Sequence, residues 1–130
     1  DTLIVDMSTV VSFVVANAKK EFLGGSLFPG LLTSSSLMFS SNAQLMDIEL
    51  EKPKRMLGKS TKESMNDGIL NGYSSLIDEF SRRIEKEQGH GLLRILTGPD
   101  SSLVKDLLPD FTYHPDIVFD GLYDIYKKNS

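Results

Sequence analysis

The feature that most constrains the fold is an amphipathic helical pattern that runs from about Thr61 to Gln88. Ser60 and Glu63 have the spacing of a capping box, in which each side chain satisfies a free backbone N–H at the helix start. The apolar residues that follow lie three or four positions apart on one face, namely Met65, Ile69, Tyr73, Leu76, Ile77, Phe80 and Ile84. The sequence therefore predicts a long helix with one buried face.

Two glycines, Gly68 and Gly72, lie four positions apart inside this predicted helix. Each lowers the stability of a helix by about 1 kcal/mol relative to alanine, so a compensating interaction is expected. We therefore expect the helix to pack closely against a strand or another helix at these two positions.

The first 28 residues have the composition of β-strands. β-branched, apolar and aromatic residues fill 3–5, 10–15 and 21–23, and a turn is expected between 17 and 20. Gly24 and Gly25 are expected to end the third strand. We predict three antiparallel strands at the front of the domain.

The remaining segments predict helices and one further strand. Pro29 suits the first position of a helix, because its missing N–H would have no intrahelical partner there. The apolar stripe of that helix would be formed by Leu31, Leu32, Ser35, Leu37 and Met38. Residues 92–96 predict a central strand, followed by a short helix at about 100–108 and a turn at Pro109-Asp110. A terminal helix would have an apolar face formed by Val118, Leu122, Ile125 and Tyr126. This order of strands and helices indicates an α/β domain with a mixed sheet.

Composition excludes several classes of protein. The chain of 130 residues has no cysteine, which excludes a disulfide framework, a thiolate nucleophile and cysteine-ligated zinc. No apolar run approaches the roughly 20 residues of a membrane helix, and the net charge of −4 argues against a nucleic-acid partner. The basic run at 52–55 lacks interleaved aromatic residues, so we interpret it as a solvated connection. A single cytoplasmic domain with no nucleic-acid or membrane partner is expected.

The N-terminus begins directly on the apolar run at 3–5, without the basic and apolar regions of a signal peptide. A strand at the first residues leads us to expect that the chain was cut, or that its partner segment lies on another chain.

Three segments could carry chemistry. Asp6-Met7-Ser8-Thr9 lies at the reversal between two predicted strands, where hydroxyl and N–H groups can bind phosphate oxygens and a carboxylate can hold a cation. Gly24-Gly25 and Pro29-Gly30 could let the backbone approach a ligand. Thr97-Gly98-Pro99 follows the predicted central strand, and ligands bind at such strand ends in α/β sheets. An ordinary turn is the simpler explanation of 6–9, and a structural reversal explains the glycine segment equally well.

Other motifs for catalysis fail on inspection. Gly58-Lys59-Ser60-Thr61 is similar to the end of a P-loop, but Pro53 occupies the position of the first glycine, so a Walker motif is rejected. His90 and His114 lack metal-ligand spacing and are interpreted as surface or loop histidines. The absence of a Gly-x-Ser-x-Gly sequence disfavours a hydrolase of that type.

Taken in order, these segments resemble the C-terminal half of type III pantothenate kinases. The resemblance is carried by 6–9, Gly24-Gly25, Pro29-Gly30, Ala43-Gln44-Leu45, 49–53, Gly58 with Thr61, Gly68, Gly72-Tyr73, Thr97-Gly98 and Asp120-Gly121-Leu122. That family belongs to the actin-like superfamily of sugar and acyl kinases, and it phosphorylates pantothenate in the first step of coenzyme A synthesis. The resemblance implies that residues 1–130 form the second actin-like (ribonuclease H-like) domain, a mixed sheet flanked by helices, and that the N-terminal domain is absent.

The resemblance also implies ligand-binding residues. Asp6 would help hold the metal, while Ser8 and Thr9 would contact phosphate in a motif that the family usually writes Asp-Phe-Gly-Thr. Thr97 and Gly98 would line ATP in the adenosine motif, usually Thr-Gly-Gly. The implied cofactors are ATP, magnesium and a monovalent cation, either potassium or ammonium.

Four positions depart from the family pattern. Ser8 replaces a glycine that lets the backbone reach phosphate, and Pro99 replaces a glycine and removes an N–H near the nucleotide. Asn42 stands where the family usually has a threonine that contacts pantothenate across the dimer interface, and Met46 stands where proline is common. Three of the four touch implied ligand sites, which predicts weakened nucleotide or substrate binding.

The family's first phosphate motif and its general-base aspartate belong to the half that this chain lacks. Because phosphoryl transfer requires donor, metal and acceptor to be positioned together, half a cleft should not turn over. The leading interpretation is a subunit or fragment of a type III-like pantothenate kinase. It would need a chain that carries the missing N-terminal domain and would form a homo- or heterodimer through the long helix. A non-catalytic assembly or regulatory partner with the kinase fold and an unrelated α/β binding domain remain alternatives.

Overall fold

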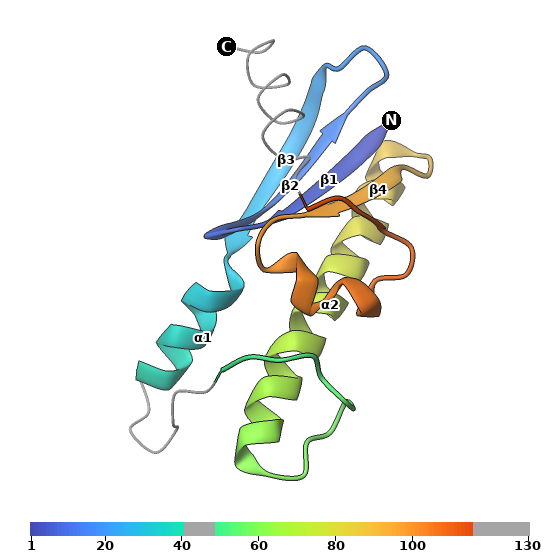
Figure 1. Ribbon diagram of the computed structural model, residues 1–130. Coiled ribbons are helices and arrows are strands. Elements are labelled where there is room, and N and C mark those ends of the chain that lie inside the picture. The colour runs from blue at the N-terminus through green and yellow to red at the C-terminus, as the bar shows by residue number, and fades with distance from the viewer. Residues whose placement is uncertain (41–48, 116–130) are drawn as a thin grey trace.

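The computed structural model contains a five-stranded mixed sheet with a long helix against one face (Figure 1). It describes residues 1–40 and 49–115. The strands are β1 (Thr2–Met7), β2 (Val10–Ala16), β3 (Phe22–Pro29), β4 (Leu93–Thr97) and β5 (Thr112–Tyr113). In the sheet order β3-β2-β1-β4-β5, the first three are antiparallel neighbours, whereas β4 runs parallel to both β1 and β5. The predicted α/β class, consistent with an actin-like domain, is confirmed.

The long helix α2 (Thr61–Gln88) begins and ends as its sequence predicts. The Glu63 N–H donates to the Ser60 hydroxyl over 3.1 Å, which is the first half of the capping box. The Glu63 carboxylate accepts its return bond from the Lys59 N–H at 2.7 Å, one residue before the predicted partner. Gly89 ends the helix with a left-handed φ of 85°, a conformation that glycine adopts without strain.

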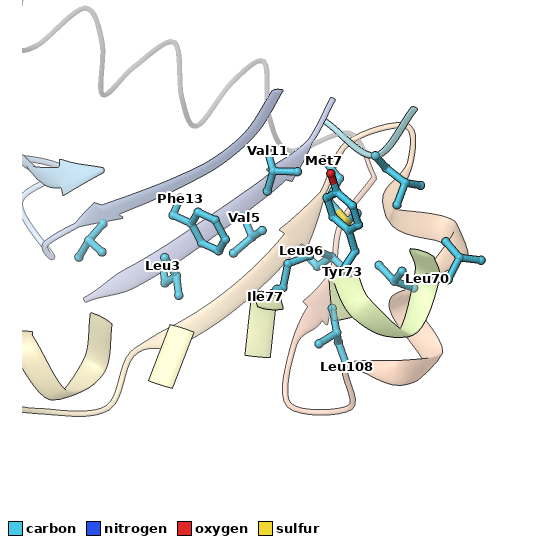
Figure 2. Packing of buried hydrophobic residues seen from close by; sticks show 13 residues of the cluster. Leu3, Val5, Met7, Val11, Phe13, Leu70, Tyr73, Ile77, Leu96 and Leu108 are labelled. Carbon is cyan, nitrogen blue, oxygen red and sulfur yellow. The ribbon is translucent and has the colours of Figure 1, made fainter. Parts of the chain in front are cut away.

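The hydrophobic core lies between the sheet and α2. Alternate residues of the neighbouring strands β1 and β2 point toward the helix, namely Leu3, Val5, Met7, Val11 and Phe13 (Figure 2). Val15 of β2 belongs to the same cluster. From α2, Tyr73 and Ile77 complete the cluster as predicted, together with Leu70, which the predicted face omitted. The aromatic ring of Phe13 stacks on that of Phe80 with centroids 4.4 Å apart. Burial of this alternating pattern fixes the register of the sheet against the helix.

The two glycines of α2 do not pack closely in this chain. A Cβ added at Gly68 or at Gly72 would meet no atom within 4 Å, and both residues are exposed. The expectation of a tight contact within the chain is therefore wrong, because these positions lie on the side of α2 that faces away from the sheet.

The third strand is longer than predicted. β3 continues through Gly24 and Gly25 to Pro29, so the expectation that the glycines end it is wrong. Glycine is disfavoured in strand interiors but is common at irregularities, and β3 lies at the edge of the described sheet. The pairing of β2 with β3 shifts register between Val15 and Ala16, and Gly24, with a φ of 145°, is the residue that pairs with Val15. Proline is also tolerated at an edge, so Pro29 pairs with Val10 instead of opening a helix.

Helix α1 (Leu31–Ser40) begins two residues after Pro29 and buries a narrower face than predicted. Leu31 and Ser35 are buried, whereas Leu32 is 54% and Leu37 is 64% exposed. In Figure 1, α1 extends away from the sheet in continuation of β3, which explains why little of its surface is covered.

The segment after β4 also differs from its prediction. Instead of one helix at 100–108, two short 3₁₀ helices occupy Ser101–Leu103 and Lys105–Leu107. The buried residues Val104 and Leu108 flank the second of these 3₁₀ helices. Strand β5 was not predicted, because two residues carry too little pattern. The predicted terminal helix and the Asp120-Gly121-Leu122 motif lie outside the described residues.

Residues 49–60 run beside the first turns of α2 (Figure 1). The Asn66 side chain accepts from the Glu51 N–H at 2.8 Å and donates to the Glu51 carbonyl at 2.9 Å, and Asn71 donates to the Arg55 carbonyl at 2.9 Å. Lys52 and Arg55 are exposed, as expected of a solvated connection, although Lys52 forms a 2.6 Å ion pair with Asp106. No helix among the described residues is both long and apolar enough to span a membrane.

Candidate functional site

Five of the six predicted site residues meet where two parallel strands end. β1 and β4 are neighbours in the sheet, and Asp6 pairs in register with Thr97. Directly beyond these residues the chain makes the Ser8-Thr9 reversal into β2 and, on the other strand, the turn at Gly98. Because the two strands are parallel, both turns leave the sheet at the same edge, where α/β sheets usually bind ligands.

Asp6 is 8% exposed as a residue, and its carboxylate accepts a 2.6 Å hydrogen bond at Oδ1 from the Ser8 hydroxyl. This bond holds the carboxylate toward the reversal, and it occupies part of the hydrogen-bonding capacity of one of its two oxygens. The Ser8 side chain is half-buried and Thr9 is exposed. The reversal therefore presents a carboxylate, two hydroxyls and backbone groups within one short segment.

Gly98 allows the two strand ends to come into direct contact. Its φ of 101° lies in the region that favours glycine. A Cβ at this position would lie 2.5 Å from Asp6 Oδ1 and 2.6 Å from the Met7 nitrogen, so no side chain fits. The Asp100 N–H donates to the Met7 carbonyl at 3.1 Å, and the buried Ser101 hydroxyl donates to the Gly98 carbonyl at 2.5 Å. These bonds fix the β4 turn against β1.

A second glycine, Gly30, lies directly against the Ser8-Thr9 backbone. A Cβ on Gly30 would lie 2.2 Å from the Thr9 carbonyl oxygen and 2.7 Å from that of Ser8. The sequence singled out Gly30 as a possible point of approach to a ligand, whereas here its close neighbour is the Ser8-Thr9 backbone. Two glycines that lie far apart in the sequence thus contact consecutive parts of one segment, Gly98 at Asp6-Met7 and Gly30 at Ser8-Thr9.

Two polar groups near the β4 turn lie in a partly or fully desolvated environment. Thr97 is fully buried, and its hydroxyl oxygen has no hydrogen-bond partner among the described residues. Burial raises the pKa of the Asp100 carboxyl above its ordinary range. Unpaired or desolvated polar groups are costly in a folded chain and gather at functional sites. Both groups lie beside the Asp6 reversal.

Two of the other residues singled out in the sequence lie outside the described residues, and the two histidines are exposed. Asn42 and Met46 lie outside the described residues. His90 and His114 are exposed, as expected, and the His90 ring lies 3.4 Å from the Asp1 carboxylate. Sequence reasoning missed Asp100 and Ser101, since an Asp-Ser pair after a turn is too common to signal a role.

Residues 1–83 match a family model described as type III pantothenate kinase. The chain belongs to this family. It is 38% identical over 126 residues to a type III pantothenate kinase of Persephonella marina, covering 96% of this chain and 49% of that protein. A type III pantothenate kinase of Rhodococcus jostii is 36% identical over 132 residues, with 98% and 49% covered. The chain spans about half the length of the curated relatives that it matches.

A solved structure supports the fold independently. A crystal structure from Campylobacter jejuni, described as a candidate Baf family transcriptional activator, superposes with a TM-score of 0.66 at 18% identity. The match covers 99% of this chain and 58% of that protein. At this identity the likeness concerns the fold alone.

Proposed function

We propose that this chain supplies the phosphate- and nucleotide-binding half of a type III pantothenate kinase, an enzyme that transfers phosphate from ATP to pantothenate. The proposal rests on one observation, namely that Asp6, the Ser8-Thr9 reversal and Thr97-Gly98 lie together at the ends of two parallel strands. It is supported by the family to which the chain belongs. In phosphoryl transfer, catalysis depends mainly on positioning and charge stabilisation, and this edge supplies groups for both.

Each residue has a distinct role in the proposal. Asp6 would help hold the magnesium ion that accompanies ATP, while Ser8 and Thr9 would bind phosphate oxygens through hydroxyl and N–H groups. Thr97 and Gly98 would form the strand end against which the nucleotide lies. Asn42 would contact pantothenate.

The donor set at Asp6 fits a metal that arrives with the nucleotide. Magnesium in such sites is bound by one or two carboxylates together with phosphate oxygens, so a single carboxylate is sufficient. Within residues 1–40 and 49–115, no group of three His, Cys, Asp or Glu side chains could hold a metal by itself. Bound magnesium would offset the negative charge of the phosphates. The proposal also includes a potassium or ammonium ion, which the family resemblance implies.

A chain that carries an N-terminal domain would complete the site and provide the general base. Curated relatives are about twice as long as the stretch matched here, which supports a second half-site. We further propose that the chain assembles as a homo- or heterodimer through α2. We also propose a cytoplasmic location, which is compatible with the absence of cysteine.

Native mass spectrometry of the protein purified from its source tests this function. We expect a bound second chain, and we expect the complex to phosphorylate pantothenate in an ATP-dependent manner. A lone monomer or a homodimer without activity would contradict the proposal.

Two observations favour a second candidate, a non-catalytic partner that keeps the kinase fold. The Ser8 hydroxyl donates to one of the two Asp6 carboxylate oxygens, and Pro99 has no N–H to offer a nucleotide. Under this candidate, the double variant Ser8→Gly/Pro99→Gly should bind MgATP no better than the unchanged chain in calorimetry. A large gain in affinity would instead show that the site is a weakened nucleotide site.

A further inference from the structure

Tyr73 joins α2 to the junction at which β3 passes into α1. The residue is 8% exposed, and its ring meets that of Phe28 edge-on with centroids 5.9 Å apart. The hydroxyl oxygen lies 2.9 Å from the Pro29 carbonyl, 3.2 Å from the Gly30 carbonyl and 2.7 Å from the Ser34 hydroxyl. The Tyr73 hydroxyl is the donor toward both carbonyls, which can only accept, and toward the Ser34 oxygen, so its single proton is shared among these contacts. Three segments are thus tied at one buried atom.

The junction held by Tyr73 is in direct contact with the Ser8-Thr9 reversal. Gly30 is buried, and even one added carbon would lie 2.2 Å from the Thr9 carbonyl oxygen. The Gly30 carbonyl also accepts the Ser34 N–H at 3.0 Å, which is the first turn of α1. With no free space between the two backbones, the position of Gly30 determines the position of Thr9.

We propose that Tyr73 is a positioning residue for the phosphate-binding reversal. It does not touch the reversal itself. Its hydroxyl holds Pro29 and Gly30 in place, and Gly30 in turn supports the Ser8-Thr9 backbone by direct contact. The inference rests on the proposed function in that it takes the reversal as the phosphate site.

The variant Tyr73→Phe isolates the hydroxyl, because it keeps the ring and its contact with Phe28. The matched control is Ser81→Ala on the same helix, since the buried Ser81 hydroxyl donates to the Ile77 carbonyl at 2.6 Å, away from the junction. Backbone amide resonances of the ¹⁵N-labelled chain would be recorded for both variants, followed by titration with MgADP.

We expect Tyr73→Phe to shift the amide resonances of Ser8, Thr9 and Gly30 and to raise the Kd for MgADP by about threefold to tenfold, the range of one hydrogen bond. Ser81→Ala should change neither quantity. An unchanged Kd, or unshifted Ser8 and Thr9 amides, would overturn the inference.

Failure of the proposed function has a different signature. In that case MgADP would leave the resonances of the unchanged chain unmoved. The positioning role would then be decided by the nucleotide-free spectra, where unshifted Ser8 and Thr9 amides in Tyr73→Phe would refute it. In the assembled complex, the same variant should raise the KM for ATP more than it lowers kcat, a split that a general loss of folding would not give.

Discussion

At the residue scale, Asp6 is the charged group of the proposed site. An asparagine at this position would still accept the Ser8 hydrogen bond but would carry no charge for a cation. We expect Asp6→Asn to lower pantothenate phosphorylation by the assembled complex by about a hundredfold or more, with assembly unchanged. The exposed Asp110→Asn is the matched control, and full activity in Asp6→Asn would refute the cation role.

Gly98 gives a second residue-scale prediction, because neither its φ nor its surroundings accept a side chain. We expect Gly98→Ala to lower the free energy of unfolding by about 1–3 kcal/mol, measured by urea denaturation. Gly91→Ala is the matched control, since its Cβ would make only an ordinary 3.5 Å contact with the Glu85 side chain. Equal stability of the two variants would contradict the described turn.

At the element scale, the exposed glycines of α2 reduce the stability of the helix without any contact in this chain that explains them. We expect Gly72→Ala to raise the free energy of unfolding by about 1 kcal/mol in urea denaturation, because the new methyl group meets open space. Gly58→Ala should do the opposite, since its Cβ would lie 2.4 Å from the Glu63 backbone.

The variant Gly72→Ala also tests the proposed assembly through α2. If a partner packs on this face, the Gly72 methyl group should weaken association in analytical ultracentrifugation while the chain itself becomes more stable. Unchanged association would remove the exposed glycine face from the assembly proposal.

At the scale of the whole molecule, acid should loosen the attachment of β4 to α2. Burial raises the pKa of Glu85, but hydrogen bonds from Arg94 and the Leu92 N–H outweigh it, so the pKa lies below the ordinary glutamate range. This pairing stabilises the fold above the unfolded-state pKa, and the contribution is lost as pH falls through the folded-state value. Glu85→Gln should therefore reduce stability at neutral pH and flatten its loss in acid, as followed by thermal unfolding across pH. An unaltered pH profile would refute the link.

Features that depend on residues close together in the sequence could be predicted, whereas features that depend on contacts between distant segments could not. The ends of α2 were predictable because Ser60, Glu63 and Gly89 act within one turn of the helix. Asp6 and Thr97 could be expected at one edge because both follow apolar strands, although their register pairing required the parallel ladder. The contact between Gly30 and Thr9 could not be foreseen, since it depends on how β3 leaves the sheet.

The side-chain amides that bind residues 49–60 to α2 should make this segment and the start of the helix unfold locally as one unit. Toward its C-terminal end α2 is held by the core, whereas near its start Asn66 and Asn71 hold the neighbouring segment by hydrogen bonds to backbone. The helix therefore spans two regions of different local stability. In hydrogen exchange, the backbone amides of its first turns and of residues 49–60 should lose protection together and early. This would report local unfolding of both segments while the sheet stays folded.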